Sequence, residues 1–480
     1  MPQALARYAG IVPDPGQFEA AMARPPPLTL WAHPERVTRG QLQRLLAAGA
    51  LESDAVSWDP LLLRLPPGAP AAHHWGYFAG LFQIQEEAAR LPVTWLDPQP
   101  GERILDLCAA PGNKTAQIAL AMRNTGTVVA NELQTGRLSA MRQLIRRLGL
   151  VNVVTLRGAG ESLPLHTGPF DRVLVDAPCS GEGTWRRHPP RQEVGRRGIP
   201  AEAREQLVRR QLRLLERALR VCRPGGRVVY ATCTFAPEEN EGVINALLQR
   251  AEGAVEIEPP PPGGPRTSPG ITAWDGESYD ARVAHCRRIW PGQTETGGFF
   301  VAVLRRLDTA EGGIPQPAQR DLIEDAQAFP GHPATRVIQS RFGLEDDALR
   351  GLVTGRDRGR YLHYCSAGLH WPAHPIPDAR GLAVVGLQVK PFKPTTAFAL
   401  WRGRMATRNR AELDAEAAEV FLQRGRLPVS AAMAETPMDG VGWVIITHAG
   451  HPLGVARRTG AGMLESQFPK AWMRARGGGG

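Results

Sequence analysis

Cysteine pairs, long apolar runs and lysines are all scarce in this chain of 480 residues. Its six cysteines lie far apart and include no C-x-x-C pair, which argues against a zinc site and against a disulfide framework. No stretch approaches the roughly 18 uninterrupted apolar residues of a membrane span. Residues 1–17 lack the basic and then apolar build of a signal peptide. We therefore expect a reduced, cytoplasmic protein that uses neither a metal nor a membrane.

Basic residues outnumber acidic ones, and nearly all of them are arginine. The formal net charge is +10, and only four of the 57 basic residues are lysine. Such a balance attracts polyanions, and guanidinium groups suit phosphate binding and base stacking. A general bias of composition towards Ala, Gly, Pro and Arg explains the same figures. Composition alone therefore leaves nucleic-acid binding and compositional bias equally open.

Short apolar runs alternate with helix-like segments from residue 101 onwards. The strand-like runs are 103–110, 126–132, 152–156, 171–178 and 226–232. The helix-like segments are 113–123, 136–149 and 205–226, with apolar residues recurring at helical spacing. This alternation predicts an α/β fold, with a parallel sheet that is covered by helices on both faces. A further run at 296–306 is expected to close the sheet.

Changes of composition divide the chain into four parts. Residues 1–85 form an irregular N-terminal α+β region, and 86–307 carry the strand–helix alternation. Residues 308–342 have the polar character of a linker with helical pieces. Residues 343–476 change to short apolar β runs, which predicts a small β-rich C-terminal domain.

The segment 104–119, ILDLCAAPGNKTAQIA, joins the first strand to the first helix. Its small residues let a ligand approach the backbone, and free amides are expected at the helix N-terminus. It matches neither G-x-G-x-x-G nor the P-loop, so a pyrophosphate is not its natural ligand. Glu132, after the next strand, suits the hydroxyls of a ribose. Together these features favour S-adenosylmethionine, the alternative being an ordinary βα turn with a surface glutamate.

Two cysteines follow strands that should end at the same edge of the sheet. Cys179 comes shortly after Asp176 in VLVDAPCSGEGTW, and Cys233 ends VVYATC. By position alone, Cys233 could equally be a half-buried filler. A thiolate that adds to carbon 6 of a pyrimidine lets carbon 5 accept a methyl group, with an acid at nitrogen 3 and a base for the carbon-5 proton. Two thiols and a carboxylate therefore indicate this chemistry, and we expect both thiols to be partly ionised at neutral pH.

Four segments resemble, in order, successive motifs of the RNA cytosine-C5 methyltransferases. They are 105–115, 171–184, 228–244 and 288–302, and residues 78–89 resemble the segment just before the cofactor loop of that family. The variants TCTFAPEENEG and PCSGEGTWRR look most like the bacterial 16S ribosomal RNA subgroup. Residues 442–474 resemble the end of a PUA-like RNA-binding domain. The resemblance implies a Rossmann-like class I methyltransferase domain between an N-terminal RNA-binding region and a PUA-like C-terminal domain.

The resemblance also implies a role for each matching residue. Cys233 would be the nucleophile, and Cys179 would assist release of the product. Asp176 would contact the cofactor or the target base, and Lys114 would hold the base or Asp176. Glu132 would bind the ribose, with Arg137 close by. The methionine part of the cofactor would lie against the backbone of Cys108, Ala109, Ala110, Pro111, Gly112, Asn113 and Lys114.

One departure from the family concerns the adenine. Many members carry an aspartate after the third strand, whereas residues 155–164 of this chain contain no aspartate. Glu161 is the carboxylate in that stretch. The resemblance therefore leaves adenine recognition in this enzyme open.

The implied activity is methylation of carbon 5 of cytosines in 16S ribosomal RNA, with ribosomal RNA or the small subunit as partner of a monomer. A transfer RNA substrate is one alternative, and a non-catalytic RNA-binding protein on the same fold is another. Intact Cys179 and Cys233 argue against a binding protein, which needs neither thiol. A DNA cytosine methyltransferase is disfavoured because the cysteine after Thr232 is not expected in that family.

Overall fold

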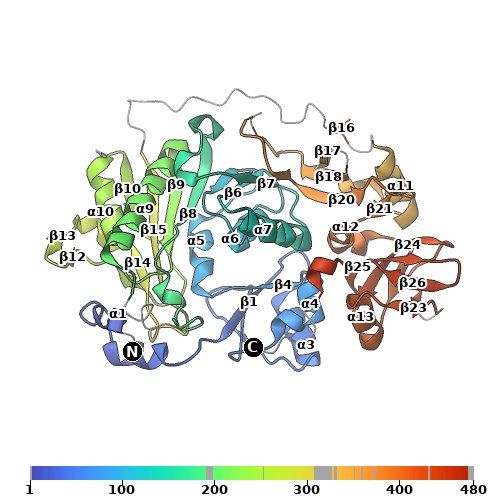
Figure 1. Cartoon of the computed structure of the whole chain (residues 1–480), viewed down its shortest axis with the longest axis horizontal. Helices are drawn as coiled ribbons and strands as arrows, with labels where there is room; N and C mark the ends of the chain where they lie inside the picture. Colours follow the sequence, from blue (N-terminus) through green and yellow to red (C-terminus); the bar gives the residue numbers. More distant parts are fainter. Residues whose placement is uncertain are drawn as a thin grey trace.

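The structure is a computed structural model that describes residues 3–473, except 191–197, 252, 308–326, 329–331, 351, 358–359, 372–373 and 431–432. Figure 1 shows a large central sheet with its helices, the N-terminal region in blue along the lower side, and the C-terminal region in orange and red at the right. Among the described residues, no helix has the length and apolar character needed to cross a membrane, and no cluster of side chains could hold a metal ion.

A ten-stranded sheet forms the centre of the molecule, with the order β11-β14-β15-β9-β8-β5-β6-β7-β19 and with β10 (Val255–Glu258) paired to β15. Its parallel part consists of β5 (Arg103–Asp106), β6 (Thr127–Glu132), β7 (Val153–Arg157), β8 (Phe170–Asp176) and β9 (Cys222–Thr232). The strand order reverses beside β5. A ligand site is expected at such a point, outside the carboxyl ends of the strands.

The α/β fold is confirmed, but the sheet is mixed and not wholly parallel. Its antiparallel strands are β10 and, in addition, β11 (Ser268–Pro269), β14 (Arg287–Ile289), β15 (Phe299–Arg306) and β19 (Ala379–Arg380). Only residues 290–298 connect β14 to β15. A parallel connection needs a crossover of a dozen or more residues, so this short loop forces an antiparallel pair.

Helices cover both faces of the sheet. Successive residues of a strand point to opposite faces, and apolar residues on both faces are buried under helices. Ile104 packs with α5 (Leu91–Leu96), α6 (Asn113–Ala121) and α7 (Thr135–Leu148). Leu105, on the opposite face, packs with α9 (Ala201–Val221) and α10 (Glu241–Arg250). The apolar stripe expected within 136–149 is buried on α7.

The N-terminal region contains a small antiparallel sheet of order β2-β3-β1-β4. Its strands are β1 (Leu28–Ala32), β2 (Asp54–Ala55), β3 (Leu62–Leu65) and β4 (Phe82–Ile84), and its helices are α3 (Arg39–Ala48) and α4 (Trp75–Phe78). The chain before this sheet is separate from it. Helices α1 (Gln3–Ala6) and α2 (Pro15–Met22) instead pack beside Phe235 and Trp290, on the loops that follow β9 and β14.

The C-terminal region holds two five-stranded sheets and not one small β unit. The first contains β16 (Gln327–Ala328), β17 (Leu352–Asp357), β18 (Tyr361–Ser366), β20 (Leu382–Gly386) and β21 (Lys393–Pro394). The second contains β22 (Arg410–Glu412), β23 (Arg426–Pro428), β24 (Gly442–His448), β25 (His451–Arg458) and β26 (Met463–Ser466). Helices α12 (Thr396–Arg402) and α13 (Ala415–Leu422) accompany them.

The expected linker 308–342 ends in a helix, in line with the helical pieces expected there. Residues 333–342 form the helix α11 (Pro333–Phe342), which buries Ile338 and Phe342 in the same core as Phe398. Residues 308–326 and 329–331 of that segment lie outside the described residues.

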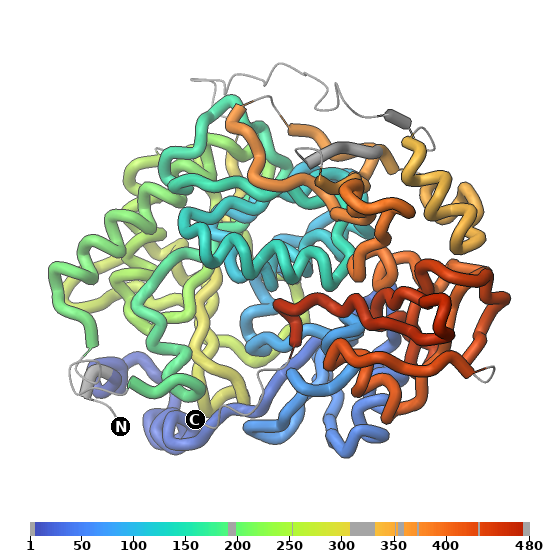
Figure 2. The backbone as a smooth tube through the Cα atoms, turned by 45° about the vertical axis from the view of Figure 1, so that its right-hand side comes forward, coloured from blue at the N-terminus to red at the C-terminus, as the bar shows by residue number. Residues whose placement is uncertain are grey.

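The C-terminal region packs against the rest of the chain. One apolar core joins Leu42 and Leu46 of α3 to Phe421 of α13. Figure 2 shows the red C-terminal segments lying beside the blue N-terminal ones. Strand β19 lengthens the central sheet by pairing with β7. The C-terminal region is therefore attached to both of the preceding parts.

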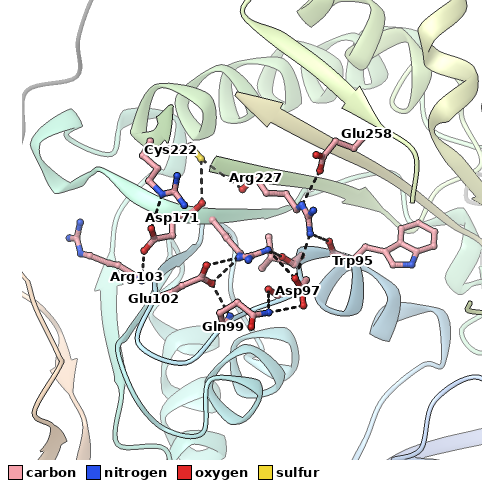
Figure 3. A network of polar contacts seen from close by, with 12 residues as sticks. Trp95, Asp97, Gln99, Glu102, Arg103, Asp171, Cys222, Arg227 and Glu258 are labelled. Carbon is pink, nitrogen blue, oxygen red and sulfur yellow. Dashed lines mark hydrogen bonds and ion pairs between the residues drawn. The ribbon is translucent and has the colours of Figure 1, made fainter. Parts of the chain in front are cut away.

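Ion pairs fill the amino-terminal edge of the parallel sheet, opposite the expected site (Figure 3). Arg172 Nε lies 2.8 Å from Glu102, and Arg227 Nε lies 3.0 Å from Glu258. Cys222 is buried here, with its Sγ 3.9 Å from the carbonyl oxygen of Asp171. This cysteine is a core residue at the start of β9, and part of the arginine excess serves the fold.

Candidate active site

Four strands bring chemically active side chains to one edge of the sheet. Asp106, Glu132 and Asp176 end β5, β6 and β8, and Cys233 directly follows β9. The parallel pairings β5–β6, β5–β8 and β8–β9 place these ends side by side. The residues that the sequence singled out therefore meet at the carboxyl edge of the sheet.

The loop 107–112 has the open backbone that a close-fitting ligand needs. Gly112, the residue before α6, has a φ of 105°, and a Cβ there would lie 2.7 Å from Met141 Cγ. Only glycine fits this left-handed and crowded position. No side chain caps the start of α6, so its first amides can serve a polar ligand.

Glu132 and Arg137 lie together beside this loop. The carboxylate of Glu132 is buried, accepts a hydrogen bond from the Gln134 amide at 2.7 Å, and lies 3.5 Å from Arg137 Nη1. Arg137 also donates to the carbonyl oxygen of Ala110 at 2.5 Å. The guanidinium therefore ties the loop to the end of β6, and the carboxylate faces the same space as the loop backbone.

Asp106 is a buried carboxylate that the sequence analysis missed. Its Oδ2 accepts a hydrogen bond from Thr115 Oγ1 at 2.7 Å, whereas its Oδ1 is buried with no hydrogen-bond partner among the described residues. Burial raises the pKa of Asp106 to about 7, opposed by the bond from Thr115. An unsatisfied oxygen beside an open loop is a place where a donor of a ligand could bind. The sequence signal that could have identified it is an aspartate at the end of the apolar run 103–106.

Lys114 and Asp176 form a close ion pair across the site. Lys114 Nζ lies 2.7 Å from Asp176 Oδ2 and 5.4 Å from the centre of the Phe299 ring. Burial alone would lower the pKa of Lys114, but the charge and hydrogen bond of Asp176 outweigh burial and raise it. The lysine is therefore a fixed cation, and its charge also acts on Cys233.

The two cysteines lie next to each other. Cys179 Sγ is 3.5 Å from Cys233 Sγ, although the residues are far apart in the chain. Both side chains are half-buried. A backbone hydrogen bond of 2.9 Å from Gly183 N to the carbonyl oxygen of Cys233 joins the loop after β8 to the loop after β9. The two thiols can therefore act on one bound group.

The expectation that Cys179 is partly ionised is wrong. Its hydrogen bond with Cys233 Sγ, then burial, and then the charges of Cys233 and Glu239 raise the pKa of Cys179 well above the usual range. Cys179 therefore stays a protonated thiol while Cys233 sulfur lies beside it.

The remaining predicted residues occupy ordinary surroundings. Cys108 lies in the loop after β5, where burial raises the pKa of its thiol. Cys286 and Cys365 are buried, as expected for structural residues. Glu161 lies in a short helical turn and pairs with Arg210 of α9 at 3.3 Å.

A second missed carboxylate, Glu182, lies behind the two cysteines. It begins the turn η5 (Glu182–Thr184) and is 1% exposed. Its Oε2 accepts hydrogen bonds from Tyr8 Oη at 2.7 Å and from Thr234 Oγ1 at 3.2 Å. Nothing in the local sequence links residue 8 to residue 182, so no motif could have indicated this contact.

Comparison with protein families gives two matches. Residues 93–305 match the model for the 16S rRNA methyltransferase RsmB/F, and residues 408–474 match the model for the PUA domain of methyltransferase RsmF. The first range includes the whole parallel part of the sheet and both cysteines. The second coincides with the second C-terminal sheet.

Curated relatives extend these matches over most of the chain. A ribosomal RNA small subunit methyltransferase F from Aeromonas salmonicida (strain A449) is 31% identical over 435 residues, which cover 88% of this chain and 85% of that protein. A 28S rRNA (cytosine-C(5))-methyltransferase from Mus musculus is 31% identical over 306 residues, or 63% of this chain and 37% of that protein.

Among solved structures, a methyltransferase homologue protein from Pyrococcus horikoshii is similar. It is 31% identical with a TM-score of 0.54, and the alignment covers 63% of this chain and 94% of that chain. The similarity thus spans nearly the whole archaeal chain but leaves more than a third of this one unmatched.

Proposed function

Because this chain belongs to the RsmB/F family of RNA cytosine-C5 methyltransferases, we propose that it methylates carbon 5 of cytosine in 16S ribosomal RNA. The observation that carries the proposal is the 3.5 Å separation of Cys179 Sγ and Cys233 Sγ at the edge that holds the open loop 107–112. The name of the Aeromonas relative supports the ribosomal small-subunit substrate.

S-adenosylmethionine fits the residues around the loop after β5. Its ribose hydroxyls would find an acceptor in Glu132, and its methionine part would lie against loop backbone and the uncapped start of α6. Asp106 Oδ1 is a further acceptor without a protein partner. When bound, the cofactor supplies an electrophilic methyl group.

Cys233 is assigned as the nucleophile. Carbon 5 of cytosine is a poor nucleophile until a thiolate adds to carbon 6. In this step the sulfur–carbon bond forms, and the electron pair of the ring double bond moves towards carbon 5 and the ring. Lys114 stabilises negative charge at Cys233 before the attack.

Asp176 and Lys114 are assigned to hold and polarise the base. Nitrogen 3 gains electron density when carbon 6 is attacked, so a hydrogen-bond donor there stabilises the adduct. Asp176 is 31% exposed on its side chain, and its pair with Lys114 fixes its direction. The pair can thus present a cationic N–H group of Lys114 to the ring from one rigid position.

Cys179 is assigned to release of the product. The hydrogen bond with Cys233 sulfur and its charge are among the causes that raise the pKa of Cys179. Once Cys233 is bound to carbon 6, that negative sulfur no longer exists, so the pKa of Cys179 falls. Cys179 can then lose its proton to solvent and, as a thiolate, remove the carbon-5 proton; the electron pair of that carbon–hydrogen bond re-forms the ring double bond, and Cys233 leaves carbon 6 as a thiolate. On this account, Cys179 can act as a base only after Cys233 has attacked carbon 6.

A methyl-transfer assay tests the proposal directly. Radiolabelled S-adenosylmethionine is offered with 16S ribosomal RNA, small ribosomal subunits, transfer RNA or DNA, and Cys233→Ala is the control. We expect label in ribosomal RNA or subunits and none with the variant. Exclusive labelling of transfer RNA or DNA would refute the substrate, and RNA binding without labelling would favour a binding protein.

A further inference from the structure

The first two helices, α1 and α2, pack against the loops that follow β9 and β14. Phe235, in the loop after β9, stacks on Trp290 with ring centres 5.3 Å apart and planes 9° apart. Phe18 of α2 meets both rings edge-on, at 5.4 and 5.9 Å. Figure 1 shows α1 below β14, at the far left, whereas the strand β1 lies to its right under the central sheet. The segment 3–22 is thus packed on the methyltransferase domain.

A chain of hydrogen bonds runs from Tyr8, which lies between α1 and α2, to the residues that follow the two cysteines. Tyr8 Oη donates to Glu182 Oε2, and Thr234 Oγ1 donates to the same oxygen. Thr234 Oγ1 also lies 2.6 Å from Ser180 Oγ. Since Thr234 follows Cys233 and Ser180 follows Cys179, one carboxylate group fixes the neighbours of both thiols.

The charged surroundings explain why Glu182 depends on these donors. Among the described residues, its Oε1 is buried without a hydrogen-bond partner, and Arg204 Nη2 lies 3.8 Å away from it. Burial raises the pKa of Glu182 to about 7, the charge of Glu239 raises it further, and the bonds from Tyr8 and Thr234 together with the charge of Arg7 oppose this rise. Loss of the Tyr8 hydroxyl would remove one of the two hydrogen-bond donors that the described part of the chain gives this side chain.

We propose that Tyr8 and Glu182 are positioning residues that set the geometry of Cys179 and Cys233. The inference rests on the proposed function, which it deepens by making the N-terminal segment part of the catalytic apparatus. The loops follow different strands, and one backbone hydrogen bond, from Gly183 to Cys233, links them beside the thiols. Side chains add to this constraint: Ser180 Oγ lies 2.6 Å from Thr234 Oγ1, Ser180 N donates to Glu239 Oε2 at 3.0 Å, and Glu182 holds the Thr234 hydroxyl and connects it to Tyr8.

The test uses the full-length chain with Tyr8→Phe, which removes the hydroxyl and keeps the ring packed. We expect the kcat for RNA methylation to fall about ten- to hundredfold, the range for a small misplacement of catalytic groups. The KM for RNA and the affinity for S-adenosylmethionine should stay within about twofold. Glu182→Gln, which keeps an oxygen acceptor for both hydroxyls, should retain more activity than Glu182→Ala.

Tyr364→Phe is the matched control. Tyr364 is also buried, and its hydroxyl donates to Thr335 Oγ1 at 3.0 Å in the C-terminal region. This variant should keep the wild-type kcat. A Tyr8→Phe enzyme that is less heat-stable but has an unchanged kcat would overturn the proposal, because the hydroxyl would then serve only the fold.

A second measurement does not need RNA and separates the two proposals. Phenylarsine oxide binds two thiols that lie close together, so it should bind wild-type protein through Cys179 and Cys233 and fail to bind Cys179→Ala. Tyr8→Phe should bind it several-fold more weakly. Equal binding by wild type and Tyr8→Phe contradicts the positioning role even if the wild-type enzyme proves inactive on ribosomal RNA.

Discussion

At the scale of single residues, one ion pair and one thiol pair define the chemistry of the site. Lys114 and Asp176 are 2.7 Å apart, and the sulfur atoms of Cys179 and Cys233 are 3.5 Å apart. The strand ends in the sequence predicted that Asp176 and the two cysteines would meet, and the family resemblance implied that Lys114 would hold Asp176 or the base. The sequence could not predict Tyr8 and Glu182, whose contact joins segments 174 positions apart.

Glu132 provides a test of the cofactor site at the same scale. Glu132→Ala should weaken S-adenosylmethionine binding by roughly 1–3 kcal/mol, the cost of leaving a buried hydroxyl without its acceptor. Titration calorimetry measures this change, and the exposed Glu52→Ala is the control. An unchanged affinity in the folded variant would place the ribose elsewhere.

At the scale of elements, the parallel part of the sheet and both helical layers follow from the alternation in the sequence. The strands at the edges of the sheet do not follow from this alternation. Strand β19 consists of Ala379 and Arg380 alone, and it pairs with β7 through a part of the chain that composition assigned to another domain. Such a short strand carries no periodicity, so tertiary contacts alone decide it.

The approach of β19 to β18 predicts the effect of one glycine substitution. Gly381 has a φ of 54°, and a Cβ there would lie 2.3 Å from the carbonyl oxygen of Tyr364. Gly381→Ala should therefore lower the free energy of unfolding by about 1–3 kcal/mol, seen as a lower Tm.

Gly276→Ala is the matched control for this substitution. Gly276 also has a positive φ, of 82°, but a Cβ there would meet nothing within 4 Å. A Gly381→Ala loss no larger than the control's would mean that the close approach between β19 and β18 is unimportant.

At the scale of the whole molecule, the arginines that produce the net charge of +10 differ in their surroundings from one region to another. Arginines at the amino-terminal edge of the sheet are paired with carboxylates (Figure 3), whereas Arg457 on β25 is exposed in the part that matches the RsmF PUA domain. From composition alone, nucleic-acid binding and a general bias of composition explained the excess of arginine equally well. The paired arginines show that part of the excess is structural.

We expect the C-terminal sheet to add RNA affinity and no chemistry. Replacing Arg457 and Arg458 with alanine should weaken RNA binding and reduce the slope of log affinity against log salt by roughly 1–2, because two phosphate contacts are lost. Cofactor affinity, measured on the same variant, should not change. An unaltered salt slope would indicate that RNA approaches from another face.

The most direct test of the account compares two cysteine variants with 16S ribosomal RNA and S-adenosylmethionine. Cys179→Ala should attack carbon 6 and then stall, so that a covalent protein–RNA species survives denaturing electrophoresis and disappears on RNase digestion. Cys233→Ala should form no such species and transfer no methyl group. Accumulation of the covalent species by Cys233→Ala in place of Cys179→Ala would contradict the assignment of the nucleophile.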